Sequence, residues 1–379
     1  MNDYKYLDLL GELGKKLDNK QRAVCCRTQN TIVAAGAGSG KTQVLATRFA
    51  WLVMSEGIKA SEILTLTFTK KAAGEMYERI YQTLSFFAEH EQTPSLEKQR
   101  ANQALAEFSE THIQTLDSYC ASIVKQAANR YGIRPDFSSG SNDSDFQIQE
   151  LALPFVFENR DRLCIKTFAQ TGQLQDFSSS VLAKAVSSYT SLADEPDFFA
   201  SKFTAQEKIL LQAWNELICG SIPSESKSVL PENTMNFIDA SNYLLQEHKN
   251  ALEKKGETPY LLGLNNIISI IQEFETKSGT HLEELIPYAK TLELLIKELF
   301  VFKGNTPGYT SEIRKAVKAF KENFSQTAIS LCSYILQVDA IKDLFALFDE
   351  FTAKVNQSKR ISGNLTFKDV SELALKILY

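Results

Sequence analysis

The feature that most constrains this chain is a glycine-rich segment between a short apolar run and an amphipathic helix pattern. The β-branched run from Thr31 to Ala34 is typical of a buried strand, and apolar residues recur at helical spacing from Thr42 to Met54. Glycines let backbone N–H groups turn inward, toward the positive end of the dipole of the following helix. The order of strand, loop and helix predicts a phosphate-binding loop made of Ala35, Gly36, Ala37, Gly38, Ser39, Gly40, Lys41 and Thr42.

Two residues at the end of this loop carry the predicted chemistry. Lys41 is expected to reach the β- and γ-phosphates of a nucleotide, and the Thr42 hydroxyl is expected to bind Mg²⁺. They are the candidate catalytic residues, and Thr42 is the candidate metal ligand. Ala35 departs from the strict pattern, which has a glycine at the first position of the loop.

Gln21, upstream of the loop, has two competing interpretations. Asp18 is a typical N-cap, and Gln21 stands three residues later, where a capping box places its second member. A glutamine amide can also pair with both the donor and the acceptor edge of adenine. The local pattern favours the cap.

Two further apolar runs predict strands of the same sheet. Ile63 to Phe68 follows the loop helix as a second buried strand, so strand, helix, strand from Thr31 to Phe68 predicts a parallel βαβ unit with a right-handed crossover. Ile113 to Thr115 predicts a third strand of this sheet. Phe68 would then lie at the carboxyl edge of the sheet, where parallel sheets bind ligands. An aromatic ring flanked by Thr and Lys suits a nucleobase and its phosphate.

Composition limits the class of protein. A chain of 379 residues with 44% hydrophobic residues is expected to form two or more globular domains. No apolar run is long enough to cross a bilayer and the start of the chain lacks signal-peptide features, so we expect a cytoplasmic protein without membrane contact. The net charge of −5 argues against nucleic-acid binding by bulk charge. It is compatible with a local groove that binds single strands by aromatic stacking and a few cations. The six cysteines and four histidines lack metal-ligand spacing, which predicts buried thiols.

The character of the chain changes after residue 128. A loop-rich stretch from Tyr131 to Asp145 leads into a long region without a repeat period, punctuated by prolines, which predicts an all-α insertion over residues 129–360. Its expected helices are Ile148 to Phe157, Val181 to Leu192, Ala205 to Ile218, Ala240 to Leu252, Leu261 to Glu275, Leu282 to Phe302, Ser311 to Phe324 and Ile329 to Val355. An amphipathic helix from Leu365 to Leu378 follows.

One helix of this region has a basic face. Its apolar stripe consists of Ile313, Val317, Phe320 and Phe324, while another face carries Arg314, Lys318 and Lys321. The pattern favours a solvated face, and the alternative is a track for nucleic-acid phosphates.

Three segments together resemble the first motifs of superfamily 1 helicases of the UvrD/Rep kind. They are Leu17 to Val24, Ala35 to Thr42 and Thr67 to Met76. That family commonly has alanine at the first loop position and uses a glutamine to contact adenine, so the resemblance implies this role for Gln21. It also implies ATP with Mg²⁺ as cofactors. Gln43 is expected among the nucleotide contacts, although it stands where an arginine is frequent.

The resemblance further implies contacts with single-stranded and duplex DNA. The residues at the matching positions are Thr67, Phe68, Thr69, Lys70, Thr115 and Ser118. The family usually has asparagine where this chain has Lys70, and histidine where it has Asp117.

The implied fold is an α/β P-loop NTPase with a RecA-like parallel sheet, helices on both faces and a large all-α inserted domain. Residues 1–128 would form the first part of the motor domain and residues 361–379 its return helix. The insertion at 129–360 looks like that of RecB/AddA-type helicase–nuclease subunits, and this likeness adds a second subunit of that kind to the expected partners.

The implied function is the ATP-binding N-terminal part of an ATP-dependent DNA helicase in recombination or repair. Phosphoryl transfer also needs carboxylates that hold the metal, and no hydrophobic run here ends in Asp-Glu. We therefore expect the chain to stop before the acidic motif, and we expect the 379-residue chain not to unwind DNA. The alternatives are a nucleotide- and DNA-binding module without catalysis, and a P-loop kinase or unrelated NTPase.

Overall fold

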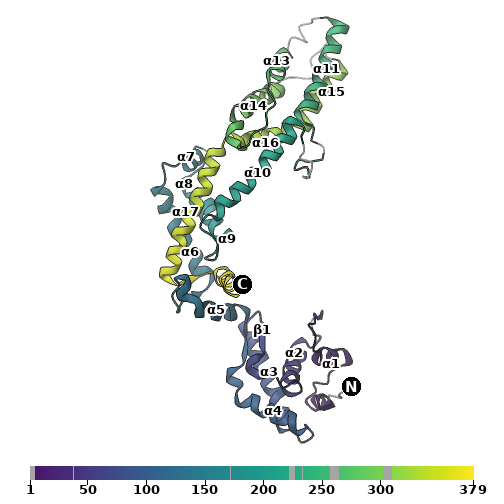
Figure 1. The fold of residues 1–379 in the computed structure, drawn as a ribbon, viewed down its shortest axis with the longest axis vertical. Helices are drawn as coiled ribbons and strands as arrows, with labels where there is room; N and C mark the ends of the chain where they lie inside the picture. The colour runs from purple at the N-terminus through teal and green to yellow at the C-terminus, as the bar shows by residue number, and fades with distance from the viewer. Residues whose placement is uncertain are drawn as a thin grey trace. The chain divides into compact units, whose positions relative to one another are not determined.

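The computed structural model describes residues 5–36, 38–170, 172–221, 227–232, 234–256, 264–301 and 310–379. Within these ranges the chain is mostly helical, with two small parallel sheets (Figure 1). It divides into two compact units, which we call unit 1 (Met1–Gly140 with Gly363–Tyr379) and unit 2 (Ser141–Ser362). The predicted start of the insertion at residue 129 differs from this division, because β3 (Ser138–Ser139) pairs with β4 (Asn364–Leu365) inside unit 1.

Unit 1 is built around helices that pack on one apolar core. Its centre contains the fully buried side chains of Trp51, Ile80 and Phe87. The described elements besides β3 and β4 are η1 (Lys5–Leu13), α1 (Asn19–Cys25), α2 (Lys41–Met54), η2 (Ala60–Glu62), β1 (Leu64–Thr67), α3 (Lys70–Glu89), α4 (Ser95–Ala106), η3 (Phe108–Glu110), β2 (His112–Thr115), α5 (Leu116–Ala127), η4 (Ala128–Tyr131) and α18 (Phe367–Leu378).

Of the three predicted strands, the second and third pair in parallel, while the predicted RecA-like sheet is not confirmed. Strands β1 and β2 pair in parallel with α3 and α4 between them in the chain, and their register matches Leu64 with His112 and Thr67 with Thr115. Because the two strands end at the same register position, their carboxyl ends lie at one edge of the pair. This edge carries the start of both α3 and α5.

The strand predicted at Thr31 to Ala34 does not form. Residues 31–34 pair with no strand among the described residues, and the side chain of Ile32 is 101% exposed. Strand β1 is also not buried, since Leu64 and Leu66 are 42% and 39% exposed. A buried parallel strand needs hydrogen-bonded neighbours and a layer on each face. The described residues supply two strands here, so β-branched composition alone does not create the sheet.

The predicted helix near the end of the chain is present as α18, and its start is capped. The Thr366 side chain accepts from the backbone N–H of Asp369, and the Asp369 carboxylate accepts from the backbone N–H of Thr366. Its buried face, which includes Val370 and Leu373, packs along α5 (Figure 1).

The described part of unit 2 is all helical and has two apolar cores. One core surrounds Trp214 and Phe320, and the other surrounds Phe177 and Phe351. The long helices α10 and α17 are in contact and diverge toward the C-terminal end of α10 (Figure 1). The elements are α6 (Ser141–Glu158), α7 (Leu163–Ala169), α8 (Leu174–Asp176), η5 (Phe177–Ala183), α9 (Lys184–Tyr189), α10 (Phe198–Cys219), α11 (Phe237–Lys255), α13 (Asn265–Glu273), η6 (Leu282–Leu285), α14 (Ile286–Val301), α15 (Ser311–Ala319), η7 (Phe320–Ser325), α16 (Gln326–Ile335) and α17 (Val338–Ser362).

Two predicted helices of unit 2 differ in detail. The helix predicted from Ile329 to Val355 is two helices, because a turn at Leu336 and Gln337, without proline or glycine, separates α16 from α17. The helix predicted from Ser311 to Phe324 widens into the π-helical turn η7, in which the Ser325 hydroxyl donates to the Phe320 carbonyl at 3.1 Å. Residues 261–263 and 302, where two further predicted helices begin or end, lie outside the described residues.

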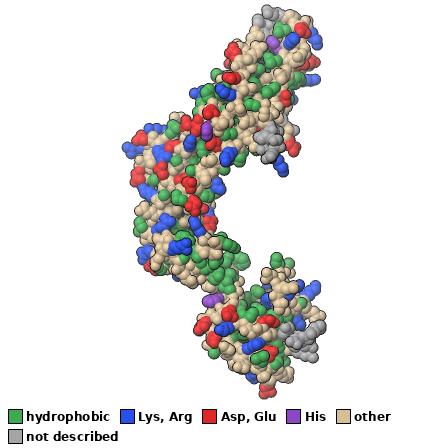
Figure 2. All heavy atoms as spheres, in the orientation of Figure 1, with side chains coloured by type: hydrophobic (Ala, Val, Ile, Leu, Met, Phe, Trp, Pro, Cys, Tyr) green, Lys and Arg blue, Asp and Glu red, His purple; other side chains and the backbone are tan. Residues whose placement is uncertain are grey.

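The described surface is mixed in charge. Figure 2 shows Lys and Arg side chains interspersed with Asp and Glu over the visible face. Among the described helices, none combines the length and the apolar composition that crossing a bilayer requires.

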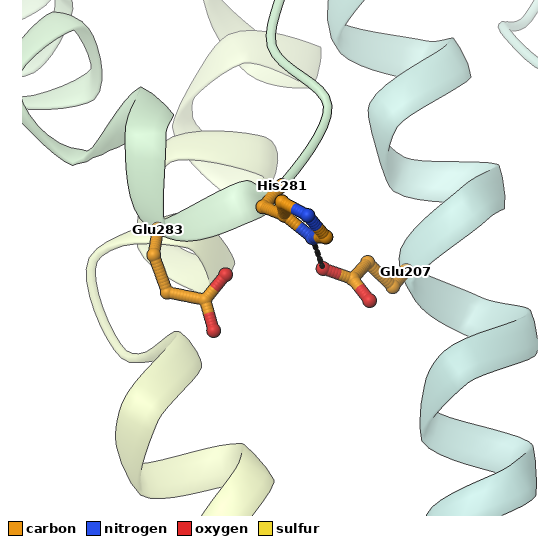
Figure 3. A group of neighbouring side chains, drawn as sticks. All are labelled: Glu207, His281 and Glu283. Atoms are coloured by element: carbon orange, nitrogen blue, oxygen red, sulfur yellow. Dashed lines mark ion pairs between the residues drawn. The ribbon is translucent and has the colours of Figure 1, made fainter.

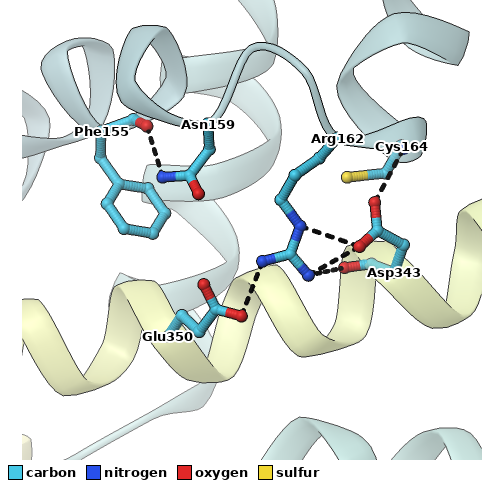
Figure 4. Close-up of polar contacts among 6 residues, drawn as sticks. All are labelled: Phe155, Asn159, Arg162, Cys164, Asp343 and Glu350. Carbon is cyan, nitrogen blue, oxygen red and sulfur yellow. Dashed lines mark hydrogen bonds and ion pairs between the residues drawn. The ribbon is translucent and has the colours of Figure 1, made fainter.

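A charged network fixes the start of α7 against α17 in unit 2. Arg162 donates to the Asp343 carboxylate at 2.6 and 2.8 Å and to Glu350 at 2.6 Å, and Asp343 also accepts from the Cys164 backbone N–H at 3.0 Å (Figure 4). Burial alone would raise the pKa of Asp343, but the hydrogen bonds from Arg162 and Cys164 outweigh it and hold this pKa below its ordinary value. Asp343 is therefore the negative group at the N-terminus of α7.

We expect Arg162→Met to lower the free energy of unfolding by about 2 kcal/mol at pH 7, because it leaves a half-buried carboxylate without its partner. A carboxyl with a depressed pKa stabilises the fold above its unfolded pKa, and this contribution is lost as the pH falls through the folded value. The gap between wild type and variant should therefore shrink below about pH 4. Urea unfolding at pH 7 and pH 3.5 measures it.

Arg160→Met is the matched control, since Arg160 is a neighbouring exposed arginine. An equal loss in both variants, or a gap that does not change with pH, would contradict the assignment of Asp343.

Candidate nucleotide site and nucleic-acid edge

The start of α2 has the backbone geometry of an anion-binding loop. Gly40 is the N-cap of α2 with φ 75° and ψ 23°, and Gly38 has φ 77°. This left-handed conformation is strained for residues that have a Cβ atom, which explains glycine at both positions. The first α-helical hydrogen bond runs from the Val44 N–H to the Gly40 carbonyl, so the N–H groups of the first turn point out of the helix end.

A cavity of about 470 Å³ lies against this loop. It combines polar groups of the loop with an apolar wall from the two flanking helices. Its lining residues are Asp18, Lys20, Gln21, Val24, Val33, Ala34, Ala35, Gly36, Ser39, Lys41, Val44 and Leu45. Of the predicted loop residues, Ala37 lies outside the described residues. The apolar wall was not predicted, although Lys41, Val44 and Leu45 share one face of α2 by their helical spacing.

Lys41 folds back over the loop that precedes it. Its Nζ donates to the carbonyls of Ala35 at 3.1 Å and Gly36 at 2.6 Å. The Ser39 hydroxyl donates to the same Gly36 carbonyl at 2.8 Å. These contacts place an ammonium group at the mouth of the loop, beside the N-terminus of α2. The result is a concentration of positive charge and N–H donors on one side of the cavity.

Gln21 is a capping residue and also contacts the loop. Its backbone N–H donates to the Asp18 carboxylate at 2.8 Å, and its Oε1 accepts from the Asp18 backbone N–H at 2.9 Å. Its Nε2 donates to the Ser39 carbonyl at 3.1 Å. The predicted capping box is therefore confirmed, and the same side chain lies on the cavity wall. The adenine contact remains a prediction.

Thr42 and Gln43 stand in the first turn of α2. Thr42 is half-buried. Gln43 Nε2 donates to the Thr47 hydroxyl at 3.2 Å, and that hydroxyl donates to the Gln43 carbonyl at 2.9 Å. The Gln43 side chain therefore runs along α2 toward its second turn.

The predicted DNA-contacting residues of unit 1 gather at the carboxyl edge of the strand pair. Phe68 follows β1 and is 92% exposed, and the exposed Lys70 begins α3. Thr67 donates to the carbonyl of Thr69, at 3.1 Å. Thr69 caps α3 by accepting from the Ala72 N–H.

On the neighbouring strand, Thr115 and Ser118 hold the start of α5. Thr115 is buried and caps α5, and its hydroxyl lies 2.8 Å from that of Ser118. The register of the strands brings this pair next to Thr67. Phe68, Thr69 and Lys70 are therefore exposed at this edge, while the hydroxyls of Thr69, Thr115 and Ser118 also hold helix starts.

The basic helix of unit 2 has the predicted buried stripe, since Ile313, Val317, Phe320 and Phe324 are all buried. Its three basic side chains differ in their exposure and their contacts. Arg314 is exposed, Lys318 lies 3.8 Å from Glu322, and Lys321 lies over the Phe300 ring at 5.9 Å, where burial lowers its pKa.

The cysteines are neutral thiols at physiological pH. Cys25, Cys164 and Cys332 are buried, and burial is the largest cause that raises the pKa of each to about 12. Burial also raises the pKa of Cys26, Cys120 and Cys219, which are partly exposed. A raised pKa disfavours the reactive thiolate form at these positions.

A group of potential metal ligands in unit 2 is held in ion pairs. Glu207 of α10, His281 and Glu283 of η6 lie within 4.8 Å of one another, with the His281 ring 3.8 Å from Glu207 (Figure 3). Glu283 accepts from Lys342 of α17 at 2.9 Å, and this contact holds the pKa of Glu283 below its ordinary value. We interpret the group as a polar link between α10, η6 and α17, because Glu283 already has a cationic partner.

The left-handed glycines, the helix N-terminus, Lys41 and the cavity have the geometry of the P-loop class of nucleotide-binding proteins. The model of the UvrD/REP helicase N-terminal domain matches residues 17–378, and the chain belongs to this family.

Several curated relatives are named as the A-type subunits of ATP-dependent helicase/nucleases. The chain is 26% identical to that of Listeria monocytogenes serovar 1/2a over 389 residues, which covers 95% of this chain and 30% of the relative. It is 23% identical to that of Clostridium botulinum strain Alaska E43, over 96% of this chain and 30% of the relative. The chain thus spans about a third of the length of these relatives.

We expect Gly40→Ala to lower the free energy of unfolding by about 1 kcal/mol, because alanine is strained at this positive φ. The new Cβ would also lie 3.4 Å from Gln21 Nε2. Gly36→Ala is the matched control, since a Cβ there meets nothing within 4 Å and the glycine has no positive φ. Urea unfolding compares the two, and equal effects would contradict the assigned loop geometry.

Proposed function

We propose that this chain is the ATP-binding N-terminal part of an ATP-dependent DNA helicase of the helicase–nuclease type, which acts in recombination or repair in the cytoplasm. The observation that carries the proposal is the glycine loop at the start of α2 with its adjoining cavity, in a chain of the UvrD/REP family. Unit 1 would form the motor part, with β1 and β2 as two strands of a RecA-like parallel sheet with helices on both faces. Unit 2 would be the helical insertion.

In this proposal the loop binds the phosphates of ATP. The N–H groups of the loop and of the first turn of α2 donate to phosphate oxygens, and Lys41 Nζ exchanges its two carbonyl partners for the more strongly attracting anion. The Thr42 hydroxyl is a hard oxygen ligand of the kind Mg²⁺ prefers. We also propose the neighbouring Gln43 as a nucleotide contact. When bound, ATP supplies the phosphoanhydride whose cleavage drives movement.

Adenine would lie on the opposite wall of the cavity. Gln21 and Val24 of α1 line that wall and offer an amide and apolar surface to a flat base, while Leu45 lines the cavity from α2. The Gln21 amide would change its partners, because Oε1 and Nε2 now serve Asp18 and Ser39.

The residues around this cavity suit binding better than hydrolysis. Asp18 is the one carboxylate among the described lining residues, and it accepts from the Gln21 N–H in the capping box. Phosphoryl transfer also needs metal-binding carboxylates and a group that positions water. A nucleotide- and DNA-binding module without catalysis therefore remains the second candidate for the 379-residue chain.

We expect Lys41→Ala to weaken ATP·Mg²⁺ binding by about 10- to 100-fold, because a charged hydrogen-bond donor to phosphate is lost. Lys290→Ala, which removes an exposed lysine of α14, should leave the affinity unchanged. Calorimetric titration measures both variants, and a phosphate-release assay on the wild type separates binding from turnover. Equal affinity of wild type and Lys41→Ala would contradict the proposed loop.

For DNA, we propose that a single strand crosses the carboxyl edge of the strand pair. The exposed Phe68 would stack on a base, and Lys70 at the start of α3 would contact a phosphate. Thr67, Thr69, Thr115 and Ser118 would set the position of these two groups and offer hydroxyls to the backbone. In unit 2 we propose Arg314, Lys318 and Lys321 as further phosphate contacts, with the exposed Arg314 as the strongest of the three. Because the relatives are named as subunits, we also propose a partner protein that completes the complex.

We expect Phe68→Ala to weaken binding of a single-stranded oligonucleotide by about 5- to 100-fold, the value of one base–aromatic stack. Phe146→Ala removes an exposed phenylalanine from unit 2 and should not change the affinity. Fluorescence anisotropy with a labelled oligonucleotide measures both. The same small change in both variants would place the DNA elsewhere.

A further inference from the structure

Helix α1 is a short element that forms one wall of the nucleotide cavity. It has seven residues, a length at which an isolated helix is marginal, so its position depends on tertiary contacts. Lys20, Gln21 and Val24 of this helix, together with its cap Asp18, line the cavity opposite α2. The distance between α1 and α2 therefore sets where Gln21 lies relative to the loop.

One side chain of α2 holds the C-terminal end of α1. Arg48 Nη1 lies 3.0 Å from the Val24 carbonyl, 3.2 Å from that of Cys25 and 2.7 Å from that of Arg27. The last carbonyls of a helix have no partner within the helix and carry the negative end of its dipole. A guanidinium at this place satisfies these groups and complements their charge.

Besides Arg48, few buried side chains join the two helices. A minor apolar cluster contains Leu17, Cys25 and Val44, and the Cys25 thiol lies 3.4 Å from the Val44 carbonyl. Arg48 lies seven residues after Lys41 and four after Val44, on the same face of α2. One helix face thus carries the phosphate-contacting lysine, a residue of the cavity wall and the arginine that holds the opposite wall.

We propose that Arg48 is a positioning residue that fixes α1, and with it Gln21, at the distance from the loop at which the site distinguishes adenine from guanine. This inference rests on the proposed ATP-binding function. Phosphate affinity and base selectivity are then separate properties of the site, because the proposed phosphate contacts come from the loop and α2, whereas the proposed contact of Gln21 with the base comes from α1. Loss of Arg48 should therefore impair base selectivity and spare phosphate binding.

The experiment compares fluorescent ATP and GTP analogues and inorganic tripolyphosphate as ligands of the 379-residue chain. In the wild type, we expect tripolyphosphate binding and a preference for ATP over GTP. Arg48→Met should lower the ATP:GTP affinity ratio by about tenfold, toward the ratio of Gln21→Ala, and change tripolyphosphate affinity by less than about twofold. The double variant Gln21→Ala with Arg48→Met should show no further loss, because both act on one interaction.

Two further variants separate positioning from general stability. Arg100→Met is the matched control, because Arg100 Nη1 donates in the same way to the Met54 and Ser55 carbonyls at the C-terminal end of α2, at 2.7 and 3.0 Å. It should keep the ATP:GTP ratio even where it lowers thermal stability. Arg48→Lys retains a cation at the end of α1 and should recover part of the ratio; it also serves as the test variant if the methionine variant does not fold.

The inference is overturned if Arg48→Met keeps the wild-type ratio, if it lowers tripolyphosphate affinity in parallel with ATP affinity, or if Arg100→Met changes the ratio equally. A wild type that binds tripolyphosphate without preferring ATP over GTP also overturns the inference, but it supports the proposed phosphate-binding loop. A wild type that binds neither ATP nor tripolyphosphate overturns the proposed function itself.

Discussion

The N-terminus of α2 is the constraint on which the rest of unit 1 depends. A helix end leaves several N–H groups without acceptors, and here two glycines in the left-handed conformation lead the chain into that end. The same turn brings Lys41 back over the loop carbonyls. The adjoining cavity is lined by Lys41 and Ser39 on this side and by residues of α1 on the other, so both helices shape it.

Helix ends are a recurring site of stabilisation in both units. Arg48 satisfies the C-terminal carbonyls of α1, and Arg100 does the same for α2. In unit 2, Asp343 accepts from the N-terminal amide of Cys164 and is itself held by Arg162. Each of these contacts joins two helices through a charge placed at the end of a dipole, which positions short helices more sharply than apolar contact alone.

Local patterns predicted the features that depend on neighbours in sequence. The loop, helix α2, the Asp18–Gln21 capping box and the buried stripe of the basic helix all follow from residues within a few positions of one another. Several features that depend on distant partners were not predicted. The run Thr31 to Ala34 lacks a pairing strand among the described residues, so it does not form a strand despite its β-branched side chains.

Other differences have the same cause. Residues 129–140 pack with unit 1 because Ser138 and Ser139 pair with a strand more than 200 positions away in the chain, a distance no local pattern reports. Arg48 carries no local signal either, because its three acceptors lie at the end of α1 and just beyond it. The central claim, that the loop before α2 holds a nucleotide, is tested most directly by amide hydrogen exchange with and without ATP and Mg²⁺. The account predicts slower exchange at the amides from Gly38 to Val44 when nucleotide is added; unchanged exchange there, under conditions in which ATP binds, would contradict it.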